Sequence, residues 1–133
     1  MPVAWPSACT TAGPVAVIVQ RTGHPLASQV RIARTWTARV VGLLATPVFP
    51  DGTGLILPRC HSIHTIGMRY PIDAVFVDRS GRIVALKARL GPGRIIPPVS
   101  RGWAVVELPG GTLEHHDVRP GDVLAVRASW SGW

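Results

Sequence analysis

The segment that decides the fold is PIDAVFVDRSGRIVAL, residues 71–86. It contains two runs rich in β-branched residues, 73–78 and 82–86, and such runs are typical of strands. The loop between them, from Asp78 to Arg82, contains Gly81, which adopts a positive φ without steric cost. A short loop of this kind between two such runs predicts a β-hairpin with a bulge.

Further short apolar runs, bounded by Gly and Pro, recur on both sides of this hairpin. They cover residues 15–19, 54–58, 103–108 and 123–126. A further short strand is expected at 30–32, where Val30 and Ile32 alternate with Arg31. The continuous run Val15–Val19 suits a strand buried on both faces. Arg119-Pro120-Gly121-Asp122 has Pro and Gly at the two central positions of a type II turn. We therefore expect a mainly β fold, a barrel-like curled sheet of six to seven short strands.

Helices are expected to be few. Trp36, Val40, Leu43 and Leu44 recur at the spacing of one helical face, and Pro47 ends that segment. A second, single helical turn is expected over residues 113–116, with Thr112 as its N-cap. The sequence therefore predicts one or two short helices beside the sheet.

The length of 133 residues fits one domain. We expect an irregular lead-in at 1–14, a single β-rich domain at 15–128 and a tail at 129–133. Hydrophobic residues make up 47% of the chain and charged residues only 16%, so some apolar surface stays exposed. We therefore expect a monomer or a weak homo-oligomer that binds a small molecule or a protein partner.

The chain is basic, with 14 Lys and Arg against 7 Asp and Glu. The arginines are spread singly along the sequence, without a basic helix or cluster, and we therefore do not expect nucleic acid as a partner. The N-terminal residues lack the pattern of a signal peptide, and the apolar run at 15–19 is too short to span a bilayer. We expect a cytoplasmic protein that binds no membrane.

Several motifs occur together in one order. HTIGMR (64–69) is followed by PIDAVFVD (71–78) and GRIV (81–84); Arg39 with GLL (42–44) precedes them, and ELPGGT (107–112) and GD (121–122) follow. Over residues 30–126 this arrangement resembles domain-of-unknown-function family 192, a small bacterial and archaeal family. Gly67 stands where the family pattern has Trp, and the segment from Met68 to Pro71 is shorter. The resemblance implies a compact, mostly β, barrel-like fold and no established activity.

Cys60, His61 and His64 are chemically suitable metal ligands. On an extended strand, however, neighbouring side chains point to opposite faces, and the same holds for His115 and His116. No paired ligand spacing of a zinc site is present, so we expect neither a metal nor another cofactor. A Cys60 nucleophile paired with histidine remains an alternative, although a lone cysteine is more often a small buried hydrophobe.

The polar residues embedded in the most apolar segments form the candidate ligand-binding site: His64, Met68, Arg69, Asp73 and Glu107. Arg69 could hold an anionic group with two hydrogen bonds while His64 exchanges a proton. Glu107 lies between two apolar residues and is expected to be desolvated. The alternative is structural, with Asp73 bonding a turn and Glu107 paired with Arg39 or Arg69.

Two functions follow from this site. We favour a binding domain over an enzyme. This domain would recognise a small anionic ligand or a protein through the His64–Arg69 rim and the loop 91–98. The alternative is a small enzyme that uses His64 with Asp73 or Glu107 as acid and base. Gly110-Gly111 is interpreted as a turn, because no phosphate-loop lysine follows it. The structure can distinguish the two functions, because the enzyme requires that His64, Arg69, Asp73 and Glu107 line one pocket.

Overall fold

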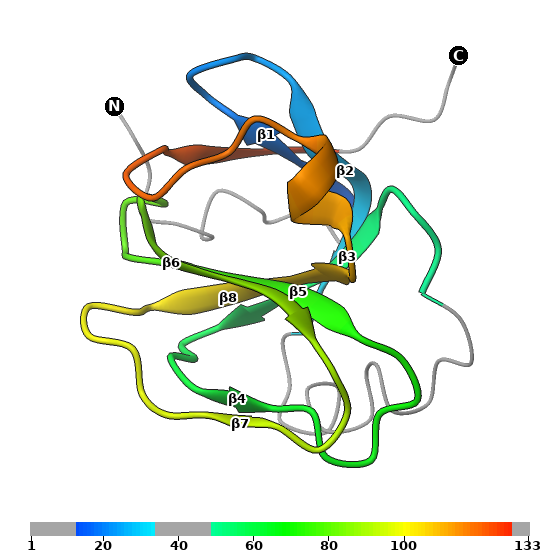
Figure 1. Cartoon of the computed structure of the whole chain (residues 1–133). Coiled ribbons are helices and arrows are strands. Elements are labelled where there is room, and N and C mark those ends of the chain that lie inside the picture. The colour runs from blue at the N-terminus through cyan, green and yellow to red at the C-terminus, as the bar shows by residue number, and fades with distance from the viewer. Residues whose placement is uncertain (1–12, 34–48, 129–133) are drawn as a thin grey trace.

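The computed structural model describes residues 13–33 and 49–128, so the expected helix at 36–44, Arg39 and Cys9 lie outside the described residues. Figure 1 shows a chain dominated by strands. The elements are β1 (Val15–Val19), β2 (Pro25–Ile32), β3 (Thr53–Pro58), β4 (Ile63–His64), β5 (Ile72–Val77), β6 (Ile83–Leu90), β7 (Ile95–Ile96), β8 (Ala104–Pro109), the 3-10 helix η1 (Thr112–His115) and β9 (Leu124–Ala128). The expected mainly β fold is confirmed.

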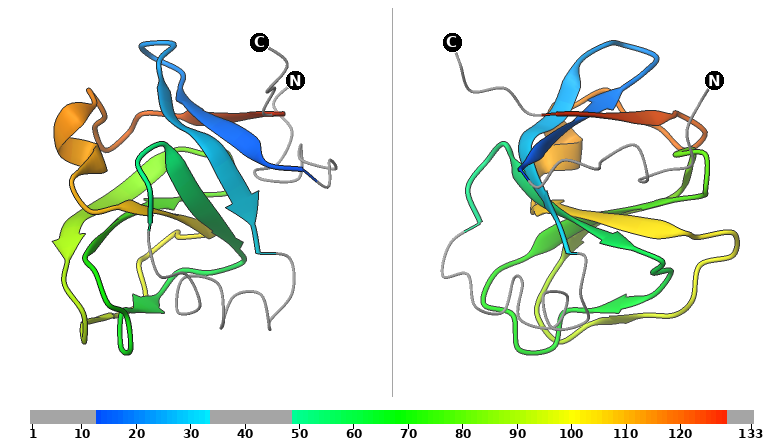
Figure 2. Two further views of the ribbon diagram at one scale, coloured as in Figure 1. Left: turned by 90° about the vertical axis from the view of Figure 1, so that its right-hand side faces the viewer. Right: turned by 180° about the vertical axis from the view of Figure 1, so that it is seen from behind.

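Seven strands form one sheet in the order β6-β5-β8-β3-β2-β1-β9, and β4 pairs with β7 in a separate two-stranded sheet. Neighbouring strands of the large sheet are antiparallel except β2 and β3, which are parallel. The sheet curls on itself as a half-barrel, with β4 and β7 below it in Figure 1 and in both views of Figure 2. No helix among the described residues is long and apolar enough to cross a membrane.

The curl brings the two outer strands of the large sheet together at their N-terminal ends. Arg82, before β6, forms an isolated bridge with Val123, before β9. Ile83 N–H donates to the carbonyl of Asp122 (2.8 Å), and Leu124 N–H donates to the carbonyl of Gly81 (2.9 Å). Backbone hydrogen bonds therefore join the two edges of the sheet at the start of β6 and β9.

The expected hairpin is present as β5 and β6, and its loop shows why it forms. The Asp78 carboxylate accepts hydrogen bonds from the backbone N–H groups of Ser80 (2.9 Å) and Arg82 (3.0 Å). Gly81 has φ 87°, a conformation that disfavours residues with a Cβ. The register shifts between Phe76 and Val77, as expected for a bulged hairpin.

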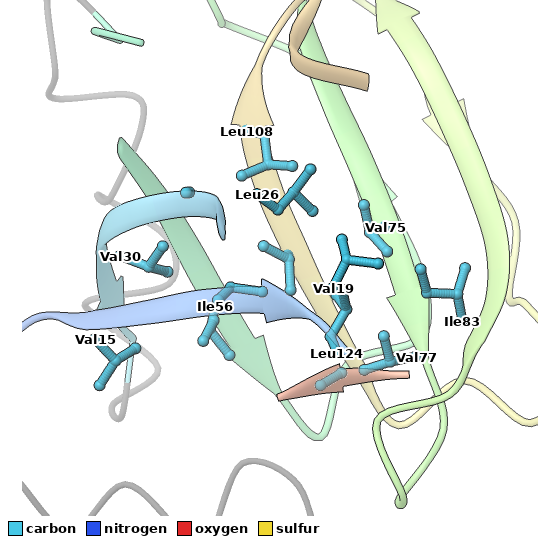
Figure 3. Packing of buried hydrophobic residues seen from close by; sticks show 14 residues of the cluster. Val15, Val19, Leu26, Val30, Ile56, Val75, Val77, Ile83, Leu108 and Leu124 are labelled. Carbon is cyan, nitrogen blue, oxygen red and sulfur yellow. The ribbon is translucent and has the colours of Figure 1, made fainter. Parts of the chain in front are cut away.

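The core has two parts, one on each face of the large sheet. Alternate residues of β5 show this division, because Val75 and Val77 pack in the first cluster and Ala74 and Phe76 in the second. Figure 3 shows the first cluster, which includes Val15, Val19, Leu26, Val30, Ile56, Val75, Val77, Ile83, Leu108 and Leu124. β5 and β8 are buried along their whole length, so they are the central layer of the molecule.

Four local expectations need correction. β1 alternates between buried and half-exposed residues instead of being buried on both faces. The strand expected at 30–32 is longer and begins at Pro25, as β2. The irregular excursion at 91–98 contains a short strand, β7, which pairs with β4. Thr112 does not cap η1; its hydroxyl donates to the carbonyl of Pro109 (2.7 Å), and Gly111, at φ 98°, holds the N-cap position.

Candidate functional site

The two carboxylates of the expected site lie on neighbouring strands but on opposite faces of the sheet. Residues paired across strands share a face, and Asp73 of β5 pairs with Leu108 whereas Glu107 of β8 pairs with Ala74. Leu108 belongs to the first cluster and Ala74 to the second. The sheet therefore separates Asp73 from Glu107, and they do not line one pocket.

Asp73 is fully buried and saturated with hydrogen bonds. One carboxylate oxygen accepts from the backbone N–H groups of Arg89 (2.8 Å) and Gly111 (3.2 Å), and the other accepts from Leu113 N–H (2.8 Å). These donors belong to the end of β6 and to the loop after β8. A buried carboxylate is stable when backbone donors replace its lost water, so Asp73 fixes two loops to the sheet.

Glu107 is also buried, with 7% of its surface exposed, but its surroundings are apolar. It lies between Leu55 of β3 and Ala74 of β5. Burial raises the pKa of its carboxyl from 4.5 to about 7. Within residues 13–33 and 49–128 no side chain forms an ion pair with it; Arg69 is exposed, and Arg39 lies outside those ranges.

Tyr70 lies on the same side of the sheet as Glu107. Burial first, and then the charge of Glu107, raise the pKa of the Tyr70 phenol. The ring of Tyr70 is tilted against that of Phe49, with centroids 5.8 Å apart. Glu107 is therefore a carboxyl group that titrates near neutral pH in an aromatic and aliphatic environment.

The remaining residues of the expected site lie around β4. His64 is exposed and pairs with Ile95 of β7, so the loop 91–98 does lie beside it. Met68 is buried in the second cluster, and Arg69 is exposed. Thr65, the residue after His64, is buried; its hydroxyl donates to the carbonyl of Gly91 (2.6 Å) and accepts from Arg94 N–H (2.8 Å). His64 and the loop share a rim, whereas Met68 supports it from the core.

Cys60 is a buried thiol, and its Sγ contacts the carbonyl of Ser62 at 3.0 Å. In the part of the chain that the structure describes, no group of three or more His, Cys, Asp or Glu side chains could hold a metal ion. The interpretation of Cys60 as a small core residue fits its place in the second cluster.

A groove of about 560 Å³ lies beyond the C-terminal end of β8, on the side of the sheet that carries the first cluster. Its lining residues are Pro25, Leu26, Ala27, Ser28, Asp51, Gly52, Arg89, Gly110, Gly111, Thr112, His115 and His116. None of the five expected site residues lines it, but the Asp73 carboxylate accepts hydrogen bonds from the backbone of two lining residues, Arg89 and Gly111. The sequence feature that marks this groove is the pair His115-His116 shortly after Gly110-Gly111, because all four residues line it.

The polar groups of the groove are already partly ordered. Arg89 forms an exposed ion pair with Glu114, through Nε and, at 3.0 Å, through Nη2. This hydrogen bond raises the pKa of Arg89 and lowers the pKa of Glu114. His116 Nδ1 lies 2.8 Å from the carbonyl of Thr112. Arg89 also has φ 51°, an uncommon conformation for a residue other than Gly.

Comparison with known proteins agrees with this architecture. A UPF0127 protein of Thermococcus sibiricus is 32% identical over 113 residues, which cover 81% of this chain and 73% of the relative. Two crystal structures are each 24% identical and share the fold. One is a Novosphingobium aromaticivorans protein of unknown function, with a TM-score of 0.72. The superposition covers 94% of this chain and 92% of the Novosphingobium chain.

The other crystal structure, from Sinorhizobium meliloti and described as a candidate transcription regulator, has a TM-score of 0.70 and covers 84% of this chain and 91% of its own. At this identity the two structures carry information on the fold alone. The model of family DUF192, described as an uncharacterized ACR, matches residues 17–126. The chain therefore belongs to the DUF192 family.

Proposed function

We propose that this chain is a small binding domain, without catalytic activity, that holds a small anionic ligand in the groove beyond β8. The observation that carries this proposal is the lining of the groove: among the described residues it contains Arg89, His115 and His116 and one acid, Asp51. A concave site with a few converging polar groups over an apolar floor is the usual form of a small-molecule site. Here the floor includes Leu26 and Ala27.

The groove is held in shape before any ligand arrives. Asp73 bonds the backbone of Arg89, Gly111 and Leu113, so it ties the end of β6 to the segment after β8 that lines the same groove. A preorganised wall lowers the entropic cost of binding. Those backbone N–H groups are engaged by Asp73, and an anion would therefore be recognised by the side chains of Arg89 and the histidines.

The ion pair of Arg89 with Glu114 is compatible with ligand binding. Both side chains are about half exposed, 58% and 47%, and exposed pairs contribute little to stability. A ligand carboxylate or phosphate could replace Glu114 at low cost, since an arginine fork binds either group through two hydrogen bonds. Glu114 then competes with the ligand for the Arg89 guanidinium group, and an anionic ligand displaces it.

Thermal unfolding in the presence of citrate, succinate, inorganic phosphate or a sugar phosphate tests the proposal. A bound compound at about 100 times its Kd stabilises the native state by about 2.7 kcal/mol. We expect one of these anions to raise the Tm of the wild type and the double variant His115→Ala/His116→Ala to lose that increase.

The variant His64→Ala is the matched control, because His64 lies on the β4 rim away from the groove. It should keep the full increase in Tm. Loss of the increase in His64→Ala, with retention in the double variant, would place the ligand on the β4 rim and overturn the groove as its site. An increase that survives in both variants would exclude both sites.

The alternative function is an enzyme with Glu107 as acid or base, and the pKa of about 7 is the observation that favours it. Asp73 is unsuited to this role because all three of its hydrogen bonds are structural. Assays with p-nitrophenyl phosphate and p-nitrophenyl acetate separate the two functions. We expect no turnover above background; turnover that Glu107→Gln abolishes would establish the enzyme instead.

A further inference from the structure

A second hollow lies at the opposite end of β8 from the groove. It has a volume of about 480 Å³ and is lined by Asp78, Arg79, Ser80, Arg101, Gly102 and Trp103. Arg79 follows β5, Arg101 precedes β8, and Trp103 N–H ties the two strands by donating to the carbonyl of Val77 (2.7 Å). The hollow is therefore built where two central strands of the sheet end side by side.

The guanidinium group of Arg79 is fixed against an aromatic ring. Its Cζ lies 4.2 Å from the centroid of the half-buried Trp103. A cation over an aromatic face is held by the ring's negative potential, and a stacked arginine keeps its planar edge free to bind an anion. Trp103 thus orients Arg79 at the wall of the hollow.

A third arginine lies at the end of the next strand. Arg59 follows Pro58, the last residue of β3, and Pro58 pairs with Ala104 of β8. Neighbouring strands are spaced about 4.8 Å apart, so the ends of β5, β8 and β3 that these arginines flank span about 10 Å. Arginines that are single in the sequence therefore flank the ends of three neighbouring strands.

The charges of this group are not neutralised within the described residues. The ion pairs there involve Arg21, Arg89 and Arg119, and none involves Arg59, Arg79 or Arg101. Of the described residues that line the hollow, Asp78 is the one acid, and its carboxylate is engaged by the backbone of Ser80 and Arg82 and by the Ser80 hydroxyl (2.7 Å). The three arginines therefore present positive charge to solvent.

Two of the three arginines also have strained backbones. Arg59 has φ 53° and Arg101 has φ 65°, in the left-handed region that residues with a Cβ rarely adopt. Gly102, next to Arg101, is packed so closely that an added Cβ would lie 2.9 Å from Cβ of His61. Such strain persists only where the surrounding structure imposes it, and it is frequent at binding sites.

We propose that this surface, formed by Arg59, Arg79, Arg101 and Trp103, binds an acidic peptide segment of a partner protein. Side chains on one face of an extended peptide recur about every 6.6 Å, so two or three carboxylates can meet cations spread over about 10 Å. One inorganic phosphate is too small to contact all three. Single-stranded nucleic acid needs free aromatic faces for its bases, and Arg79 already covers one face of Trp103.

The test is fluorescence anisotropy of a labelled ten-residue glutamate-rich peptide with the full chain, at low and at physiological salt. We expect Arg79→Ala/Arg101→Ala to weaken binding at least tenfold. The matched control is Lys87→Ala/Arg94→Ala, which removes the same charge from exposed positions elsewhere and should weaken binding less than threefold. Trp103→Leu keeps the charge and should weaken binding through the lost position of Arg79.

Three outcomes overturn the proposal. Equal weakening in the two double variants would mean that only net charge attracts the peptide. Tighter binding of a labelled ten-nucleotide oligothymidylate than of the peptide would assign the surface to nucleic acid. No binding of the peptide at either salt concentration would leave the arginines without this role. Circular dichroism of each variant verifies that the fold is retained.

Discussion

Asp73 and Glu107 are two buried carboxylates on adjacent central strands, yet they occupy opposite chemical environments. Asp73 accepts three backbone hydrogen bonds at the end of the sheet where two loops meet. Glu107 faces Leu55, Ala74 and Tyr70, and its pKa rises to about 7. The two carboxyl groups lie on opposite faces of the sheet, and one is bound by backbone N–H groups whereas the other is desolvated by apolar neighbours.

The comparison teaches that burial alone does not define the role of an acid. A buried carboxyl group can be satisfied by backbone hydrogen bonds, as Asp73 is, or it can be desolvated by apolar neighbours, which raises its pKa, as in Glu107. The first stabilises the fold by accepting hydrogen bonds from three backbone N–H groups. The second stabilises the fold only while it is protonated, and it is therefore the group that responds to pH near neutrality.

The largest expected effect is that of Asp73→Ala. It removes the acceptor of three backbone N–H groups, and we expect the free energy of unfolding to fall by about 3–5 kcal/mol, since each buried donor left unpaired costs about 1–3 kcal/mol. Urea unfolding measures this change. The exposed Asp51→Ala should change the free energy of unfolding by less than about 0.5 kcal/mol. A loss below about 1 kcal/mol for Asp73→Ala would contradict its role in fixing the loops.

The next effect concerns the pH dependence of stability. The pKa of Glu107 is about 7 in the folded state and ordinarily 4.5, so the folded state keeps a proton that the unfolded chain releases. Its contribution is complete below pH 4.5 and is lost as the pH rises through 7. The difference corresponds to about 3 kcal/mol. Glu107→Gln should abolish this loss between pH 4.5 and 8.

Urea unfolding of both proteins across that pH range checks this expectation. Glu114→Gln, a change at an exposed carboxylate paired with Arg89, is the control and should keep the decline of the wild type. If wild type and Glu107→Gln lose stability in parallel from pH 4.5 to 8, Glu107 is not the group that titrates.

The smallest effect is spectroscopic. Tyr70 is the single tyrosine of the chain, so the ultraviolet absorbance of phenolate reports its ionisation alone. In Glu107→Gln the charge of Glu107 is absent, and the pKa of Tyr70 should fall; it should stay above 10 because burial, the larger cause of its rise, remains. The same titration of Glu114→Gln should match the wild type. An unchanged pKa in Glu107→Gln would show that the two groups do not interact.

Much of the fold follows from local sequence. The β5–β6 hairpin is encoded by its two β-rich runs and by Asp78 and Gly81, and the turn before β9 has the expected positive φ at Gly121, 92°. The hydrogen bond from Asp122 N–H to the carbonyl of Arg119 (3.1 Å) closes that turn. Such features depend on neighbouring residues, and sequence alone therefore predicts them.

The candidate site depends on information that is not local. Whether Asp73 and Glu107 share a face is decided by the register of β5 against β8, and a shift of one residue reverses the answer. The groove likewise joins Pro25 to His116 through the order of strands in the sheet. Desolvation of Glu107 was foreseeable from its apolar neighbours, whereas the saturation of Asp73 by Arg89, Gly111 and Leu113 was not.

The bridge between Arg82 and Val123 has a consequence for the behaviour of the protein in concentrated solution. An open sheet ends in strands whose unpaired N–H and C=O groups can recruit another chain, and edge-to-edge aggregation begins there. Here the two outer strands engage one another at their start. Along the rest of β6, Lys87 and Arg89 place charges on the open edge. We infer that a chain with 47% hydrophobic residues is protected from edge-to-edge aggregation by this closure.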